Sequence, residues 1–345
     1  MLRALEIKNF TVFEEVKLEF SPGLNVVIGE NGTGKSHLLK LGYSIMLIGL
    51  DEMSESARSD NVGIYKLLSN VFKFESLLNL LSHSAKVANF EINLFYTNES
   101  VSITPDIILK SKFILNSFPE TTITSQPLNF RLVRPMFIPT KEIFSIYNGF
   151  AAALRTRELD FDSTYLDLAD ALALTPLKGE RAAQVKPIIE TLEKQMDGKV
   201  VVENGRFYIS TDNQKLEMPL VAEGIRKIAM LAYLLMNGSL QKGTTLFWDE
   251  PETNLNPKMI RHLAQTLVIL SGMGIQILLA THSLFLLREL QIQLSLNPNV
   301  PAQFFALKRE GKSVTVQQGN SIEDVDPIAA LDADLEQSDR YLELT

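Results

Sequence analysis

Hydrophobic and polar positions change their period along the chain, and each change predicts a different kind of element. Residues 2–10 and 12–20 alternate apolar and polar side chains around a short turn, which predicts an antiparallel pair of strands with one face in solvent. Residues 24–30 are a continuous apolar run that enters a glycine-rich loop, and residues 35–50 have helical spacing. The chain therefore opens with strands, a glycine loop and a helix.

The last third of the chain alternates regularly between apolar strands and helices. Residues 199–210 predict a hairpin that turns on Asn204–Gly205, a dipeptide suited to a tight two-residue turn. Fully apolar strands separated by helices predict a mainly parallel α/β sheet with both faces covered. The predicted strands are 244–249, 275–280, 302–310 and 313–318, and the predicted helices are 223–236, 257–270 and 283–290.

The longest apolar run, residues 263–280, comes close to the length of a membrane span. Gly272 and Gly274 divide this run, and Gln265 and Gln276 are unfavourable in lipid. A buried helix, a glycine turn and a buried strand explain the run better. We therefore expect no membrane insertion.

Residues 51–199 predict short helices and strands between polar connectors, without the sustained heptads of a long coiled coil. The Pro-, Ser- and Thr-rich segment 117–127 predicts a loop, and Thr140 is expected to cap a helix over 140–154. The other elements predicted here are a helix over 64–84, strands over 89–97 and 130–139, and helices within 160–196. We therefore expect a composite head from residues 1–50 and 200–345, and an inserted, mainly helical subdomain with some strands over 51–199.

Composition narrows the class of protein. The 345 residues are 46% apolar, which predicts a folded globular chain. A formal charge of −8 argues against a surface coated for nucleic-acid binding, although a local basic patch stays open. The chain has no cysteine, which excludes disulfides and thiolate metal sites, and its first residues do not resemble a signal peptide. A cytoplasmic location is expected.

The stretch GENGTGKS, from Gly29 to Ser36, matches the phosphate-binding pattern G-x-x-x-x-G-K-[ST] in full. Its glycines let backbone N–H groups close around phosphate oxygens, and the following helix directs its N-terminal dipole at the same anion. Lys35 is expected to reach the β- and γ-phosphates, and Ser36 to offer its hydroxyl to Mg²⁺. An ordinary glycine turn is the alternative. The residues predicted to bind the nucleotide are Gly29, Glu30, Asn31, Gly32, Thr33, Gly34, Lys35, Ser36 and His37.

Two carboxylates follow the apolar strand 244–249. Asp249 and Glu250 would lie at the carboxyl edge of the sheet, where Asp249 can hold Mg²⁺ and Glu250 can act as general base on the attacking water. A second strand ends on Thr281, His282 and Ser283, and His282 can contact the γ-phosphate or position that water. An acidic loop and an incidental histidine beside a helix cap are the alternatives.

The order of these motifs resembles the ABC-type ATPase heads of the RecF, SMC and Rad50 group. The resemblance rests on residues 7–36, the stretch DEPETNLNP from Asp249 to Pro257, and ATHS from Ala280 to Ser283. More closely, the chain is similar to short bacterial OLD-like AAA-family ATPases of phage-defence operons, without their nuclease domain. The resemblance implies a P-loop NTPase of the ABC type that uses ATP and Mg²⁺.

This resemblance also implies roles for residues outside the glycine loop. His282 matches the switch histidine, and Asn254 falls in the loop that contacts the partner subunit. A serine-x-glycine motif at a helix start normally caps the nucleotide of the opposite subunit; this chain has Gly224 and Arg226 there, but Ala222 in place of the serine. Hydrolysis is then expected to be slow or to depend on a partner. No linker-loop glutamine is evident, and Lys141 or Glu142 is a candidate for its place.

The leading hypothesis is an ATP-hydrolysing head that forms a homodimer or higher oligomer around two ATP molecules. That closure would regulate a separate effector protein, such as a nuclease, or a nucleic acid, in antiviral defence. One alternative is the nucleotide-binding subunit of a membrane transporter. Another is a non-hydrolysing scaffold that ATP stabilises, which the alanine at position 222 keeps open.

Overall fold

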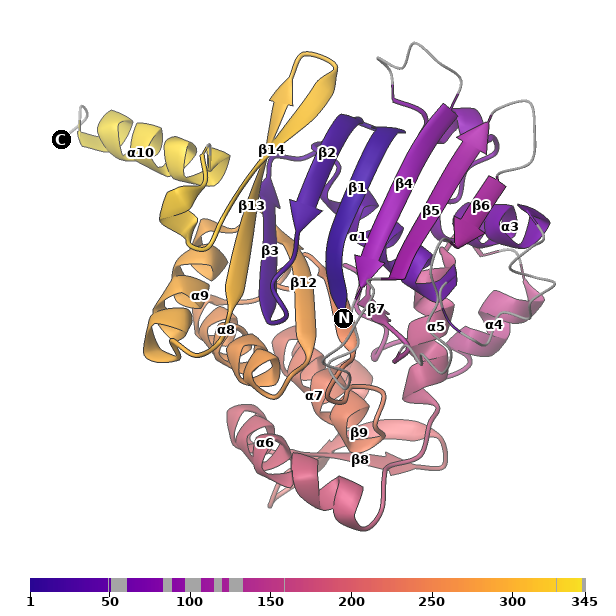
Figure 1. The fold of residues 1–345 in the computed structure, drawn as a ribbon. Coiled ribbons are helices and arrows are strands. Elements are labelled where there is room, and N and C mark those ends of the chain that lie inside the picture. Colours follow the sequence, from indigo (N-terminus) through magenta and orange to yellow (C-terminus); the bar gives the residue numbers. More distant parts are fainter. Residues whose placement is uncertain are drawn as a thin grey trace.

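Two large sheets, a small three-stranded sheet and their helices make up the described part of the chain in this computed structural model (Figure 1). The structure describes residues 1–48, 50, 61–82, 89–96, 107–114, 120–123, 133–157, 159–326 and 328–342. All elements given below belong to these ranges.

The larger sheet has six strands in the order β14-β13-β3-β12-β11-β7. All neighbours are parallel except β13 and β14, which form an antiparallel hairpin at one edge. The mainly parallel α/β sheet predicted from the apolar strands is therefore confirmed. The strands are β3 (Leu24–Gly29), β7 (Met136–Ile138), β11 (Thr245–Asp249), β12 (Gln276–Thr281), β13 (Ala302–Glu310) and β14 (Ser313–Gly319).

The second sheet is antiparallel, with five strands in the order β2-β1-β4-β5-β6. The predicted N-terminal pair is confirmed, and strands from the middle of the chain extend it through β4, which pairs with β1. The loop prediction for 117–127 is wrong at 120–123, because these residues form β6 against β5, a pairing that local composition does not reveal. The strands are β1 (Leu2–Phe10), β2 (Phe13–Glu19), β4 (Asn89–Tyr96), β5 (Ile107–Ile114) and β6 (Glu120–Ile123).

One buried glutamine joins the two sheets. The side chain of Gln276, on β12, accepts a hydrogen bond from the backbone N–H of Leu2 at 2.7 Å and donates to the carbonyl oxygens of Leu2 and Ser21 at 2.6 and 2.8 Å. This polar residue in the apolar run 263–280 therefore fixes β1 against the parallel sheet. The run itself is a helix, a glycine turn and a strand, as predicted, and no helix in the described ranges is long and apolar enough to cross a bilayer.

Helix α1 (Lys35–Ile48) lies between the two sheets, and its residues belong to the same buried cluster as those of β1 and β2. The other face of the parallel sheet is covered by three helices that the sequence predicts, with α9 running further than expected. These are α7 (Glu223–Met236), α8 (Pro257–Gly272) and α9 (Leu284–Leu296). The last described helix, α10 (Ala329–Leu342), extends from the body of the molecule in Figure 1.

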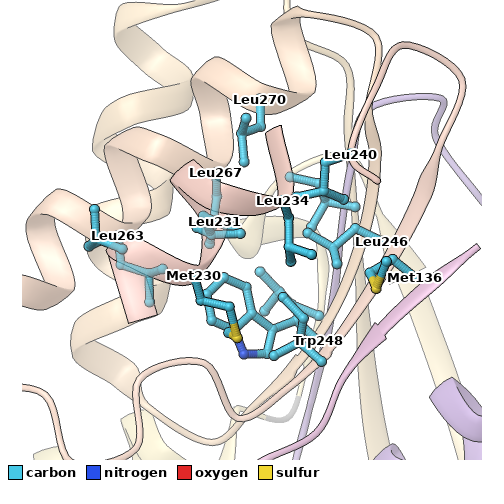
Figure 2. Packing of buried hydrophobic residues seen from close by; sticks show 14 of the residues in the cluster. Met136, Met230, Leu231, Leu234, Leu240, Leu246, Trp248, Leu263, Leu267 and Leu270 are labelled. Atoms are coloured by element: carbon cyan, nitrogen blue, oxygen red, sulfur yellow. The ribbon is translucent and has the colours of Figure 1, made fainter. Parts of the chain in front are cut away.

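Strand β11 separates the two hydrophobic clusters. All five of its residues are buried, and successive side chains point to opposite faces, so that Phe247 joins the cluster around α1 and Trp248 the cluster around α7 and α8. Figure 2 shows Trp248 packed among side chains that include Met230 and Leu234 of α7. This continuous burial holds the strand that ends in Asp249 rigidly in place.

Residues 51–199 supply strands to both sheets and helices beside them. A small sheet of β10-β9-β8 and helix α6 cover α7, and the predicted turn Asn204–Gly205 joins β8 to β9. The remaining elements are α3 (Asn61–Phe72), η1 (Leu77–Leu80), α4 (Phe150–Thr156), α5 (Ser163–Leu172), α6 (Glu180–Met196), β8 (Lys199–Glu203), β9 (Arg206–Ser210), β10 (Lys215–Glu217), η2 (Met218–Leu220) and η3 (Ile322–Asp324).

Three predictions for this middle region differ from the structure. The helix expected over 140–154 is wrong before α4, whose N-cap is Gly149, and Thr140 caps no helix. The strand expected over 130–139 is reduced to β7, and residues 130–132 lie outside the described ranges. The helix expected over 64–84 ends with α3, followed by a short 3₁₀ turn. Because no helix begins at Thr140, its side chain can contact the edge of the parallel sheet.

Candidate nucleotide-binding site

The glycine-rich loop joins β3 to α1, in the order that the sequence predicts. Gly32 and Gly34 have φ angles of 77° and 90°, in the left-handed region that favours glycine. A Cβ on Gly34 would also lie 2.6 Å from Cγ2 of Val12, in the turn between β1 and β2. The loop needs glycine at both positions, and it brings the N-terminus of α1 to the place where an anion would bind.

The side chain of Lys35 lies against this loop and is 6% exposed. Its Nζ donates hydrogen bonds to the carbonyl oxygens of Gly29 at 2.7 Å and Glu30 at 2.9 Å. Burial lowers the pKa of Lys35, while the carboxylates of Glu250 and Asp249 act to raise it. The cation is therefore held in the loop, beside two carboxylates that come from the distant part of the chain.

The other residues predicted to bind the nucleotide differ in their surroundings. Thr33 is 1% exposed, and its hydroxyl donates to the carbonyl oxygen of Glu30 at 2.8 Å, so it supports the shape of the loop. Glu30 and Asn31 are exposed. The ring of His37 meets Phe72 of α3 edge-on, with ring centres 5.7 Å apart. The structure therefore directs His37 toward α3.

Arg309 is a neighbour of the loop that sequence reasoning missed. It lies on β13, which pairs in parallel with β3, and its Nη2 donates to the carbonyl oxygen of Gly32 at 2.6 Å. No motif marks this arginine, because only the order of strands in the sheet brings residue 309 to the loop. It adds a second positive charge beside the candidate phosphate site.

Asp249 ends β11 at the same edge of the sheet and is 7% exposed. Its Oδ2 accepts a hydrogen bond from the hydroxyl of Thr140 at 3.2 Å, whereas its buried Oδ1 has no hydrogen-bond partner in the described part of the chain. Burial raises the pKa of Asp249, and the nearby hydroxyl groups of Ser36 and Thr140 act to lower it. The predicted metal residues Ser36 and Asp249 therefore lie side by side.

This arrangement fits Mg²⁺. The cation takes oxygen ligands and is commonly held by one or two carboxylates together with substrate phosphates. A buried carboxylate oxygen without a partner is costly unless a donor or cation meets it. Within the described ranges no three His, Asp or Glu side chains gather into a metal site made by the protein alone. Asp249 and Ser36 would hold the ion together with a bound nucleotide.

Glu250 follows Asp249 and faces His282. Its backbone adopts a φ of 47°, unusual for a residue with a Cβ, and its N–H donates to the carbonyl oxygen of Ala280 at 2.9 Å. Nδ1 of His282 lies 3.2 Å from Oε1 of Glu250. The sharp turn after β11 therefore directs the Glu250 side chain to the histidine that follows the neighbouring strand β12.

A second carboxylate, that of Glu252, lies near the pair formed by Glu250 and His282. Glu252 is 6% exposed, and one of its oxygens accepts the hydroxyl of Thr281 at 2.5 Å and lies 3.9 Å from Nδ1 of His282. Burial raises the pKa of Glu252, and its other oxygen has no hydrogen-bond partner among the residues that the structure describes. Sequence reasoning did not single out Glu252, although it lies in the same acidic loop.

The start of α7 carries the residues predicted to act on the nucleotide of a second subunit. Ala222 is the N-cap and provides no side-chain acceptor for the first turn. A Cβ on Gly224 would lie 3.0 Å from Cγ of Met259, so this glycine lets α7 pack closely on α8. Arg226 is directed inward, where its Nε donates to Glu142 at 2.7 Å. As a phosphate ligand, Arg226 would have to leave a carboxylate that is 3% exposed.

Lys227 is a further residue that the sequence did not reveal. It is 2% exposed, and its Nζ donates to the carbonyl oxygens of Pro251 at 3.1 Å and Thr253 at 2.6 Å, within 3.7 Å of Glu223. Nδ2 of Asn254 in turn donates to Glu223 at 3.2 Å. The loop after Glu250 is thereby fastened to the first turn of α7. The available signal was the spacing of this lysine, four residues after Glu223 in a mostly apolar helix.

A comparison with known families covers most of the chain. Residues 24–288 match the family described as "AAA domain, putative AbiEii toxin, Type IV TA system". The chain belongs to this family. The match includes the glycine loop, Asp249, Glu250 and His282, whereas Arg309, which contacts the loop, lies beyond the matched residues.

Individual relatives of this AAA domain include DNA-repair proteins. The DNA replication and repair protein RecF of Staphylococcus haemolyticus is 26% identical over 283 residues, which are 76% of this chain and 69% of that protein. The DNA repair protein RecN of Rickettsia bellii is 30% identical over 113 residues, which are 30% of this chain and 20% of that protein. Their activity on DNA is a property of those proteins.

Solved structures show the same fold. The SMC head domain from Thermotoga maritima matches with a TM-score of 0.56 and 12% identity, over 94% of this chain and 99% of that one. An SMC head bound to the C-terminal winged-helix domain of ScpA matches with a TM-score of 0.56 and 14% identity, over 93% and 98% of the two chains. The AAA domain therefore has the P-loop ATPase fold of SMC heads, and the predicted resemblance to the RecF and SMC group is confirmed. At family level the chain is an ATPase-type head.

Proposed function

We propose that this chain binds ATP with Mg²⁺ and hydrolyses it at the edge of the parallel sheet. The observation that carries the proposal is that the phosphate loop after β3 and the carboxylates of Asp249 and Glu250 at the end of β11 lie at the same edge of the parallel sheet, although they are far apart in the sequence. A phosphate loop alone binds a nucleotide. The carboxylates beside it add a place for a cation and a base for water.

Each side chain has a role that follows from its position. Lys35 and the backbone N–H groups of the loop bind the phosphates, and Ser36 and Asp249 hold the cation, which neutralises charge that develops on the phosphate. Glu250 takes a proton from the attacking water. His282, whose Nδ1 lies 3.2 Å from Glu250, orients that carboxylate, and in the imidazolium form it can also donate a hydrogen bond through Nε2 to the γ-phosphate.

We further propose that two copies close head to tail around two ATP molecules. Ala222 leaves the first N–H groups of α7 without a side-chain acceptor, so a phosphate from a second copy can accept from them. Leu220, just before α7, is 74% exposed, and Asn254 is also exposed on the loop fastened to α7. Burying these residues against a second copy would complete both sites, and hydrolysis would release the copies.

The output of this cycle is proposed to lie in another molecule. The dimer would regulate a separate effector protein, such as a nuclease, or a nucleic acid. Antiviral defence is supported by the resemblance to phage-defence ATPases and by the family description, which names a toxin of a type IV system. The similar SMC head that is bound to a domain of ScpA supports a protein partner as one form of output.

ATP turnover and oligomeric state test the core of the proposal. The unaltered chain should release phosphate in the presence of Mg²⁺. Lys35→Ala should lose nucleotide binding, whereas Lys312→Ala, an exposed lysine on the β13–β14 hairpin, should not. Glu250→Gln should bind ATP without turnover and shift from monomer to dimer in light scattering. Glu323→Gln, an exposed carboxylate far along the chain, is the matched control.

The outcomes separate the competing functions. Unchanged hydrolysis in Glu250→Gln refutes the general-base role. ATP-dependent dimers without any turnover in the unaltered chain indicate a scaffold that ATP only stabilises. Purification from the native host with a non-hydrolysable ATP analogue identifies the partner, and recovery with an integral membrane protein would favour the transporter alternative.

A further inference from the structure

Two loops meet at the carboxylate of Asp249. Strands β7 and β11 are parallel neighbours with Ile138 opposite Trp248, so the residues that follow both strands emerge at the same edge of the sheet. Thr140 lies two residues after β7 and its hydroxyl reaches Oδ2 of Asp249 at 3.2 Å. A contact between residues 140 and 249 therefore follows directly from the register of the two strands.

The two residues after Thr140 are engaged elsewhere. The Nζ of Lys141 lies over the ring of Phe161, 5.9 Å from its centre. The carboxylate of Glu142 pairs with Arg226 and accepts the backbone N–H of Ser145 at 3.2 Å. The two candidates named from the sequence, Lys141 and Glu142, therefore have partners away from Asp249, whereas Thr140 contacts it.

The hydrogen bond from Thr140 makes the two oxygens of Asp249 unequal. A carboxylate can turn about its Cβ–Cγ bond and exchange its oxygens, which differ in nothing but their surroundings. A donor fixed on Oδ2 stops that exchange and leaves the buried Oδ1 without a protein partner in the described ranges. A cation prefers an oxygen that is already desolvated and oriented.

We propose that Thr140 is a positioning residue for the cation of this site, which holds Asp249 by Oδ2 so that Oδ1 is presented to Mg²⁺. The inference rests on the proposed function, because it assigns a metal-orienting role within the same nucleotide site. Residues that orient a metal ligand commonly change metal affinity by about ten- to a hundredfold when removed. The role proposed for Thr140 thus differs from the helix cap that the sequence predicted.

The test compares the Mg²⁺ dependence of nucleotide binding among matched variants. Thr140→Val keeps the shape and removes the hydroxyl, and Thr140→Ser keeps the hydroxyl. Thr266→Val makes the same change at a buried threonine of α8, which bonds to Gln195 and the carbonyl oxygen of His262. The affinity for a fluorescent ATP analogue is measured first in EDTA and then at increasing Mg²⁺ concentration. Electron paramagnetic resonance spectra of Mn²⁺, used in place of Mg²⁺, report binding of the cation directly.

Thr140→Val should need roughly tenfold more Mg²⁺ for half-maximal binding, with unchanged affinity in EDTA. Thr140→Ser and Thr266→Val should follow the unaltered chain. A Thr140→Val titration that overlaps the unaltered one overturns the inference, and so does an equal loss of affinity in EDTA, because the loop itself is then disturbed. If Thr140→Val does not fold, Thr140→Ala and Thr140→Ser provide the same comparison. Nucleotide binding by the unaltered chain without any response to Mg²⁺ overturns the proposed function as well.

Discussion

Lys227 offers a sharp test of how the loop after Glu250 is held. Its ammonium group lies within α7 at 2% exposure and donates to the carbonyl oxygens of Pro251 and Thr253, directly after Glu250. Lys227→Met keeps most of the length and apolar stem of the side chain but removes the charge and all three N–H donors. The sequence of the loop 251–254 is then unchanged, but the hydrogen bonds that join the loop to α7 through Lys227 are lost.

The magnitude follows from the two carbonyls. The bond to Pro251 is buried, and a buried acceptor left without a donor costs about 1–3 kcal/mol. The bond to Thr253 is only partly buried, so water can replace it at a smaller cost. Burial lowers the pKa of Lys227, and removal of this buried charge offsets part of the loss. A net destabilisation of about 2 kcal/mol is expected.

The rate of ATP hydrolysis by Lys227→Met should fall more than the loss of folding stability alone would cause. Displacement of a catalytic group by about 1 Å can cost on the order of a hundredfold in rate, so we expect ATP hydrolysis to drop roughly ten- to a hundredfold. Nucleotide affinity should stay within about twofold, because the loop of Lys35 makes no contact with Lys227 that the variant removes.

Urea unfolding and steady-state phosphate release measure the two effects, with Lys258→Met as the control at an exposed lysine of α8. A variant at position 227 with normal stability and normal turnover would refute the proposed fastening. Loss of nucleotide affinity in parallel with turnover would contradict it too, since the defect would then have spread to the phosphate loop.

Three further predictions concern other buried polar groups. Asp249→Asn should raise the unfolding free energy by about 1 kcal/mol in the absence of nucleotide, since it removes a buried charge. The same variant should abolish the response of nucleotide binding to Mg²⁺. A lower melting temperature would contradict the expected stabilisation. Arg226→Met should cost about 3 kcal/mol because it leaves Glu142 unpaired, and adding Glu142→Leu should recover most of that loss in a double-mutant cycle. Burial raises the pKa of Tyr165 from 10.0 to about 12, so the folded state keeps a proton that the unfolded chain loses and stability falls as pH rises through this window. Tyr165→Phe should make the pH dependence of urea unfolding shallower there, and an unchanged slope would argue against the raised pKa.

The elements that the sequence predicted correctly share one property, which is a strong local period. Strands β11 and β12 are continuous apolar runs, and α7 begins and ends at the predicted residues because an apolar face repeats along it. Where the local signal was weak, pairing partners decided the outcome. The segment 120–123 becomes a strand only by pairing with β5. Residues 140–149 lie outside α4, in the loop that follows the edge strand β7.

The same division holds within the candidate site. Gly29–Ser36, Asp249 and Glu250 follow from the sequence alone, since glycines that permit positive φ angles and acidic residues after an apolar strand are local requirements of their chemistry. Arg309 on the phosphate loop and Thr140 on Asp249 are contacts across 277 and 109 residues. They depend on the order and register of parallel strands, which no local period encodes.

By itself, the sequence determined that a nucleotide loop and two carboxylates lie at the ends of buried strands. The tertiary structure decided which side chains surround them: it turned Arg226 inward to Glu142, fastened the loop after Glu250 to Lys227, and aimed Thr140 at the carboxylate of Asp249. The physical reason is that burial forces each polar group to find a partner, and those partners come from whichever strands and helices the fold makes neighbours.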